Sequence, residues 1–309
     1  MTTRKNYKIL SLLLCIIFIP TYIGASYYDG PIIDAHLHIN NPDDVSKIQS
    51  QMQMGNIEYA ISMPTPGSPM RLGRDYSNIF ELCDGQFVKN SWLASKYRDK
   101  ECFGFGEVGL RHYNKSKKER KVPSKQQPTI IKSFNDKSIF EYLDANTYKK
   151  PVVIHIEPYY DIENIDNLVE VKDFYESICK KYPETNFIAA HTGMMSPENL
   201  EELFSICPNL YSDFKVLIGE KRLDKFRDLH MIHDTDINLK NEWINSFKKY
   251  PNRFLFGSDG KTGYLGKRTK LIKKYASKTN RIREIFSSLS IEVQRKLFYE
   301  NAKIVFGID

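Results

Sequence analysis

The stretch that decides the fold is IIDAHLHI, residues 32–39. An apolar, strand-like run from Ile32 to Ala35 leads directly into a His-Leu-His triplet. Because strand side chains alternate between two faces, His36 and His38 should point to one side and Leu37 to the other. Two neutral imidazoles on one face are suited to binding a divalent metal ion. The stretch therefore predicts a strand that carries a pair of metal ligands.

The same context recurs further along the chain, where a potential metal ligand stands at the point where an apolar run gives way to a loop. These residues are Glu107 in FGFGEVGL, His155 in PVVIHIEP, His191 in NFIAAHTG and Asp259 in RFLFGSDG. Each has an ordinary explanation: Glu107 could pair with Arg111, and Asp259 could be a turn residue or a helix N-cap. Their shared context favours convergence, because parallel strands closed into a barrel bring their carboxyl ends to one rim.

Strand-like runs alternate with amphipathic segments such as LVEVKDFYESICKKYP (168–183) and SPENLEELFSICP (196–208), where Ser196 is the expected N-cap. This alternation predicts an α/β fold, a single-domain (β/α)8 TIM barrel, regular or distorted, over residues 26–309. Seven strands are readable, and the eighth is expected between Pro64 and Lys100 or between Tyr113 and Tyr148. The seven runs are Ile32–Ala35, Ile57–Met63, Cys102–Val108, Val152–Ile156, Phe187–Ala190, Leu210–Phe214 and Phe254–Phe256.

The order of these ligands resembles the metal-dependent hydrolases of the amidohydrolase superfamily. The resemblance covers nearly the whole chain after residue 25, including a closing NAKIVFGI (301–308), while Gly-Glu-Val-Gly-Leu around Glu107 is similar to the TatD-like deoxyribonucleases. It implies that His36, His38 and Asp259 hold one ion, that His155 and His191 hold a second, and that Glu107 bridges them. It also implies that Asp259 is the general base and that His191, if free of metal, stabilises negative charge.

Imidazole and carboxylate ligands favour Zn²⁺, bound as one or two ions, although Fe²⁺, Mn²⁺ and Ni²⁺ accept the same ligands. The expected reaction is hydrolysis of an amide, lactone or ester bond by metal-activated water. Two alternatives stay open: a TatD-like phosphodiesterase and a metal-dependent decarboxylase.

The substrate is expected to be a small molecule, either anionic or neutral. Two basic stretches follow ligand positions, RHYNKSKKERKVPSKQQ (111–127) and KTGYLGKRTKLIKK (261–274), and they would either attract an anion or serve only as solvated surface. The modest net charge makes nucleic acid a less favoured partner. Lys215 could bind an anion or pair with Asp213 or another acid, whereas His230 and His233 are expected outside the site. The further candidate substrate contacts are His112, Tyr113, Glu157, Tyr159 and Lys215.

The first 25 residues have the order of a secretory signal peptide: Arg4, Lys5 and Lys8, then an apolar ILSLLLCIIFI (9–19), then small residues before Ser26. We expect cleavage after Ala25 and export to the periplasm or medium, with an uncleaved N-terminal membrane anchor as the alternative. Cleavage would remove three positive charges and no negative ones, so the formal net charge would fall from +7 to +4. Four cysteines would remain, Cys83, Cys102, Cys179 and Cys207, either as disulfides or as free thiols.

Overall fold

The computed structural model describes residues 27–63, 76–83, 103–111, 143–144, 149–158, 165–216, 230–234, 236–262 and 274–309. The expected signal peptide and most of the two basic stretches lie outside these residues. The strands are β1 (Ile32–Ile39), β2 (Ile57–Ser62), β3 (Ile79–Glu81), β4 (Phe105–Arg111), β5 (Val152–Ile156), β6 (Phe187–Ala189), β7 (Leu210–Phe214), β8 (Phe254–Phe256) and β9 (Gly260–Thr262). The strand missing from the sequence-based count is β3, which lies in the first of the two expected intervals.

The strands form two parallel sheets, in the orders β3-β2-β1-β9 and β4-β5-β6-β7-β8. Backbone contacts join the sheets along both edges. On one side Cys83 bridges to Phe105. On the other, the Asp259 N–H donates to the His36 carbonyl at 2.8 Å. Here a side chain on Gly257 would approach the His36 Cβ to 2.7 Å, so only glycine allows this contact. The eight strands β1 to β8 therefore surround a common interior, as expected of a TIM barrel.

Strand β1 continues through both histidines instead of ending before them. Its second half pairs with β9, with Leu37 opposite Gly260 and His38 opposite Lys261. The register with β2 shifts between Asp34 and Leu37. Before the shift Ile33 packs in the barrel interior, and after it Leu37 packs with the outer core instead. Such an irregularity re-aims the side chains that follow it, so His36 and His38 face the interior.

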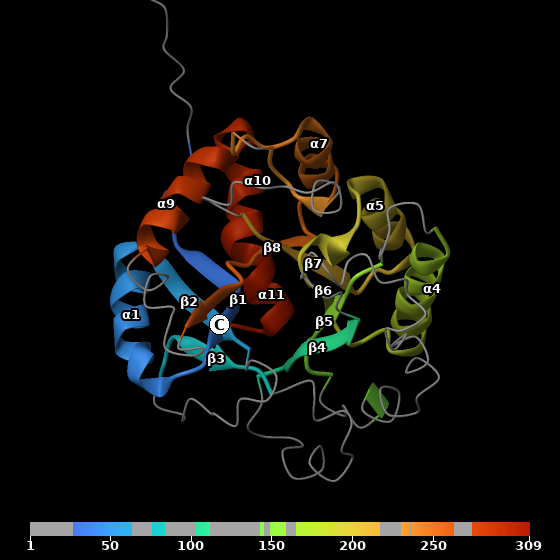
Figure 1. Ribbon diagram of the computed structural model, residues 1–309, viewed down its shortest axis with the longest axis horizontal. Helices are drawn as coiled ribbons and strands as arrows, with labels where there is room; N and C mark the ends of the chain where they lie inside the picture. The colour runs from blue at the N-terminus through green and yellow to red at the C-terminus, as the bar shows by residue number, and fades with distance from the viewer. Residues whose placement is uncertain are drawn as a thin grey trace, which may run out of the picture.

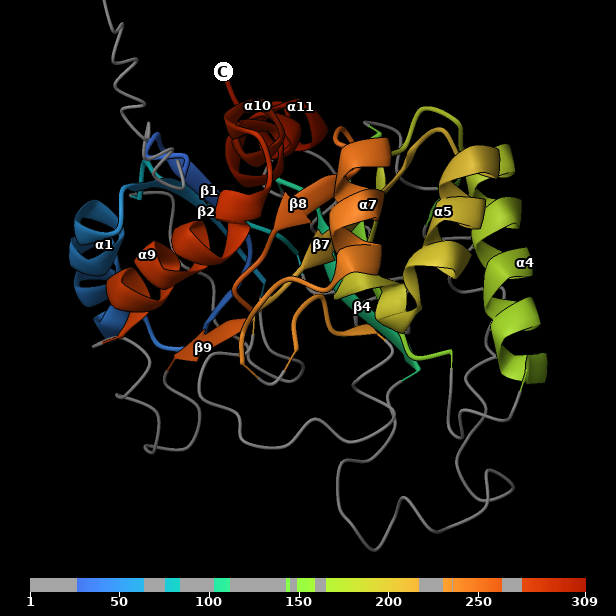
Figure 2. The ribbon, with the colours of Figure 1, turned by 90° about the horizontal axis from the view of Figure 1, so that it is seen from above.

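Helices cover the outside of the strands and close one end of the barrel. Figure 1 shows α1 (Val45–Met54), α4 (Ile165–Lys181), α5 (Pro197–Ile206), α7 (Asn241–Lys249) and α9 (Tyr275–Ile285) around the ring. The chain ends in α10 (Ile291–Arg295), a π-helical turn (Lys296–Glu300) and α11 (Asn301–Phe306). In Figure 2, α10 and α11 lie at one end of the strands and β9 at the other. Among the described residues, the end that no helix closes is therefore the one that carries the carboxyl ends of the strands, and it is called the open end below.

Two apolar clusters stabilise this arrangement. The outer cluster lies between strands and helices and contains stacked and tilted aromatic rings such as Phe214, Phe247 and Phe286. The inner cluster fills the barrel between the strands and α11, where Phe306 is 5% exposed. Burying one such ring contributes about 1.5–3 kcal/mol. The members of the inner cluster are Ile33, Ala35, Ile61, Met63, Leu82, Val153, Ile188, Ala190, Leu255, Ala302, Val305, Phe306 and Ile308.

Two local predictions can be compared with the structure. Ser196 is the N-cap of α5 in an extended conformation, but its hydroxyl does not cap the helix; it accepts from the Asn199 side chain at 3.0 Å. Cys179 and Cys207 form a disulfide between α4 and the end of α5, which decides the open question for this pair. None of the helices formed by the described residues is long and apolar enough to cross a membrane.

Candidate metal centre

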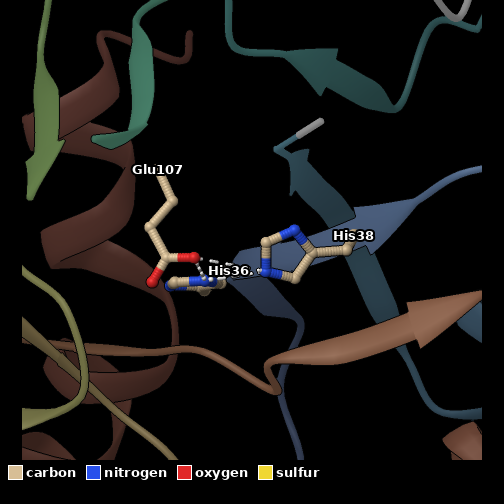
Figure 3. A group of neighbouring side chains, drawn as sticks. All are labelled: His36, His38 and Glu107. Atoms are coloured by element: carbon tan, nitrogen blue, oxygen red, sulfur yellow. Dashed lines mark hydrogen bonds and ion pairs between the residues drawn. The ribbon is translucent and has the colours of Figure 1, made fainter. Parts of the chain in front are cut away.

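Six of the predicted residues come together inside the open end of the barrel. They extend from β1, β4, β5 and the residues that follow β6 and β8, namely His36, His38, Glu107, His155, His191 and Asp259. Figure 3 shows His36, His38 and Glu107 pointing toward one another. Three groups have ligand atoms within 4.8 Å of one another: His36, His38, Glu107; His36, His191, Asp259; and Glu107, His155, His191. The convergence expected from the sequence therefore occurs, and each group could hold an ion.

Glu107 lies between two pairs of imidazoles. Its Oε2 is 3.8 Å from His36 Nε2 and 3.7 Å from His38 Nε2. Its Oε1 is 2.5 Å from His155 Nδ1 and 3.7 Å from His191 Nε2. The preceding Gly106 has φ 152°, and a side chain there would come within 2.7 Å of the Val153 Cβ, so the backbone at this point requires glycine. One carboxylate thus offers one oxygen to each imidazole pair.

Asp259 faces the same centre from the opposite side. Its Oδ1 is 3.4 Å from His38 Nε2, and its Oδ2 is 3.6 Å from His191 Nε2. Within the part of the chain that the structure describes, Oδ1 is buried and has no hydrogen-bond partner. Its nearest charged neighbours are His38 Nε2 at 3.4 Å and Lys261 Nζ at 3.7 Å, and a buried carboxylate oxygen that accepts no hydrogen bond is well placed to bind a cation. The donor set therefore fits a divalent ion.

In each imidazole one ring nitrogen faces the centre or Glu107, and the other contacts a separate hydrogen-bond acceptor. His36 Nδ1 donates to Asp213 Oδ2 at 2.8 Å, and His191 Nδ1 lies 3.2 Å from Asp213 Oδ1. His38 Nδ1 donates to the Met63 carbonyl at 3.0 Å, and His155 Nε2 lies 3.4 Å from Glu157 Oε1. Metal-binding histidines nearly always have such an acceptor, because it fixes the tautomer and the ring orientation.

Asp213 is the residue that sequence reasoning missed. It is fully buried in β7 and contacts one imidazole of the first group and one of the third. Its Oδ1 also accepts the His191 backbone N–H at 2.8 Å. The sequence feature that could have identified it is a carboxylate inside the predicted strand LYSDF (Leu210–Phe214). From the sequence, Asp213 was expected only as a possible partner of Lys215. In the structure Lys215 donates instead to Asp259 Oδ2 at 2.8 Å.

Two residues of the centre have left-handed backbones. His191 has φ 58° and Asp259 has φ 48°. This conformation costs about 1–3 kcal/mol for a non-glycine residue and persists only where the surroundings enforce it. The bonds from the His191 N–H to Asp213 and from the Asp259 N–H to the His36 carbonyl, both 2.8 Å, hold these turns. The centre therefore holds two of the strained turns among the described residues, others being at Asn56, Lys149 and Ile237.

The other residues singled out in the sequence lie either near the centre, apart from its ligand groups, or outside the described residues. Glu157 is buried beside His155, where it is placed to orient that imidazole, and its predicted contact with substrate stays a prediction. His230 and His233 belong to none of the three ligand groups; the His230 carbonyl accepts from Thr192 at 3.0 Å, and His233 Nδ1 lies 2.7 Å from the Asp234 carbonyl. The predicted substrate contacts His112, Tyr113 and Tyr159 lie outside the described residues.

Comparison with known proteins adds the fold. No protein-family model matches the sequence, and no curated protein matches it. Among solved structures, a dihydroorotase from Campylobacter jejuni aligns at a TM-score of 0.50 and 18% identity, covering 90% of this chain and 84% of the other. An Agrobacterium tumefaciens protein solved in its apo form aligns at a TM-score of 0.53 and 11% identity, covering 92% and 98%. The chain is a TIM barrel. At the level of the fold, these neighbours confirm the resemblance noted in the sequence.

At the centre of this TIM barrel the pKa values of two carboxylates are lowered, whereas those of the imidazoles shift in both directions. Burial alone would raise the pKa of Glu107 and Asp259, but nearby cations hold both well below the ordinary value. Burial alone would lower the pKa of His36 and His155, but adjacent carboxylates, chiefly Asp213 and Glu107 respectively, raise each to about 9. Burial and then Lys215 lower the pKa of His191 to about 4. The metal-free centre therefore carries protons on His36 and His155 at neutral pH.

Metal uptake should consequently release protons. Ions bind neutral imidazoles, so below about pH 9 an ion must displace the protons on His36 and His155. Apparent affinity should rise as the pH increases from 6 toward 9, by up to about tenfold per unit for each displaced proton. Calorimetric Zn²⁺ titrations of metal-free protein in buffers of different ionisation enthalpy measure this release. Heats that do not depend on the buffer would contradict the assignment.

Proposed function

We propose that the protein is a metal-dependent hydrolase of the amidohydrolase superfamily that cleaves an amide, lactone or ester bond of a small molecule. The observation that carries the proposal is Glu107, whose two carboxylate oxygens face different imidazole pairs. A fold shared with a dihydroorotase agrees with this class. Zn²⁺ is the ion we assign, because neutral imidazoles and carboxylates are its usual ligands in hydrolytic sites.

The ligands divide between two ions. We assign His36, His38 and Asp259 to one ion, His155 and His191 to a second, and Glu107 to both. When bound, divalent ions supply Lewis acidity, which activates water and polarises the scissile carbonyl. If only one ion is held, the Nε2 of His191 is free to hydrogen-bond the negative charge that develops on the substrate oxygen.

Proton transfer falls to Asp259. Its carboxylate lies at the centre of the site, and cations hold its pKa well below the ordinary value although it is buried, so it is ionised at neutral pH. It would accept a proton from the attacking water and deliver it to the departing nitrogen or oxygen. The left-handed turn at Asp259 fixes the direction in which this carboxylate points.

Metal content and a substrate screen test the proposal. We expect about two equivalents of Zn²⁺ in the loaded protein and turnover of at least one amide, lactone or ester. The double variant His36→Ala, His38→Ala should lose one equivalent and all turnover while keeping its circular dichroism spectrum. Full metal occupancy in that variant would show that the centre is wrongly assigned. Release of carbon dioxide, or cleavage of phosphodiesters alone, would replace the proposed reaction with a decarboxylase or a nuclease.

A further inference from the structure

Two lysines flank the Asp259 carboxylate. Lys215, just after β7, places its Nζ 2.8 Å from Oδ2, and Lys261, in β9, places its Nζ 3.7 Å from Oδ1. Their side chains are 13% and 35% exposed. One ammonium is therefore nearly buried, and the other stands at the edge of the open end. Both contact a residue that the proposed ions also need.

The barrel strands fix both lysines in place. Lys261 is paired across the β1–β9 ladder with His38. Lys215 follows Asp213 by two residues, and Asp213 is bonded to His36 and His191. Lys215 directly follows the last residue of β7, and its Nζ reaches Asp259 in the same centre. Both lysines are thus built into the frame of the metal centre.

Both lysines lose part of their counter-charge once the centre is filled. Among the described residues, four carboxylates face the imidazole or ammonium nitrogens of the centre, Glu107, Glu157, Asp213 and Asp259, while a fifth, Asp34, accepts the His36 backbone N–H at 3.1 Å. Asp259 is the carboxylate that both lysines contact, and one of the proposed ions would bind it too. The two ammonium groups would then share their counter-charge with an ion in a partly desolvated site, which is unfavourable.

We propose that Lys215 and Lys261 form a subsite for a carboxylate group of the substrate, next to the bond that is cleaved. A carboxylate would offer an anionic oxygen to each ammonium group in place of the Asp259 oxygens that the ion would take up. Focused positive potential in a cleft of low dielectric also raises the rate of encounter with such a substrate. This inference rests on the proposed function with two ions bound, and it specifies the substrate class.

A pair of probes that cannot be hydrolysed tests the subsite without turnover. The probes are 4-oxopentanoate, which has a ketone and a carboxylate, and 5-methylhexan-2-one, a neutral ketone in which an isopropyl group replaces the carboxylate. Binding to Zn²⁺-loaded protein is measured by calorimetry at low salt. We expect the carboxylate to bind about tenfold or more tightly than the neutral ketone, the scale of a hydrogen bond to a charged group. Lys215→Met and Lys261→Met should each remove most of that preference while metal content stays unchanged.

Lys249→Met is the matched control, because Lys249 of α7 pairs with Glu201 of α5 at 2.7 Å, and both helices lie on the outside of the ring (Figure 1). It should keep the full preference. Retention of the preference in both Lys215→Met and Lys261→Met would overturn the subsite, since the carboxylate would then be bound by metal alone. Tighter lysine-dependent binding of inorganic phosphate would overturn the carboxylate assignment.

The two proposals fail in different ways. A lysine-dependent carboxylate preference without any hydrolysis in the substrate screen would refute the hydrolase and retain the subsite. Hydrolysis without a lysine-dependent charge preference would retain the hydrolase and refute the subsite.

Discussion

Asp259→Asn should reduce turnover by about 100- to 10,000-fold, the usual contribution of a positioned general base. Asparagine keeps the shape of the side chain and one acceptor oxygen, but it cannot take a proton from water. It also removes the negative charge that faces His38, His191 and Lys215. The measurement is kcat on the best substrate from the screen, with metal content and thermal unfolding determined for the same preparation.

A nearby variant separates chemistry from folding. Ser258→Ala removes the hydroxyl of Ser258, which accepts the Gly260 N–H at 3.1 Å. It leaves the carboxylate of the neighbouring Asp259 unchanged. It should retain far more activity than Asp259→Asn. Activity close to that of the unmodified protein in Asp259→Asn, with metal present, would show that another group transfers the proton.

Asp213→Asn should weaken binding of both ions, by about 10- to 100-fold, the usual effect of changing the partner of a ligand histidine. Asp213 accepts from His36 through Oδ2 and from His191 through Oδ1. In asparagine an NH₂ group replaces one of these oxygens, and this hydrogen-bond donor would face the N–H donor of His36 or His191. A histidine ring must then rotate or change its tautomer, which misdirects the nitrogen meant for the metal. Competition with a chelator measures the two affinities.

Glu157→Gln provides the contrast. Glu157 lies beside His155, which belongs only to the group with Glu107 and His191. Its substitution should weaken one ion and spare the other. Equal effects of Asp213→Asn and Glu157→Gln on both ions would contradict the shared role of Asp213, as would unchanged metal affinity in Asp213→Asn.

Local pattern was sufficient for much of the fold. Alternating strand-like and helical segments predicted the TIM barrel and placed seven strands, because period and apolar content are written within each segment. The position of the short strand β3 was not predicted because its three residues are too few to show an alternation of apolar and polar side chains. The phase shift in β1 also escaped, since it depends on pairing with β2 and β9.

The sequence by itself determined which six residues converge, because each stands where an apolar run gives way to a loop and parallel strands share one rim. The structure extends β4 beyond Glu107, to Arg111. Only the tertiary structure decided how they face one another. The contact between His36 and Asp213 joins residues 177 positions apart. The two oxygens of Glu107 reach different imidazole pairs, and Lys215 turns to Asp259 instead of Asp213. Such pairings depend on closure of the barrel and on side-chain direction across it, which no local period specifies.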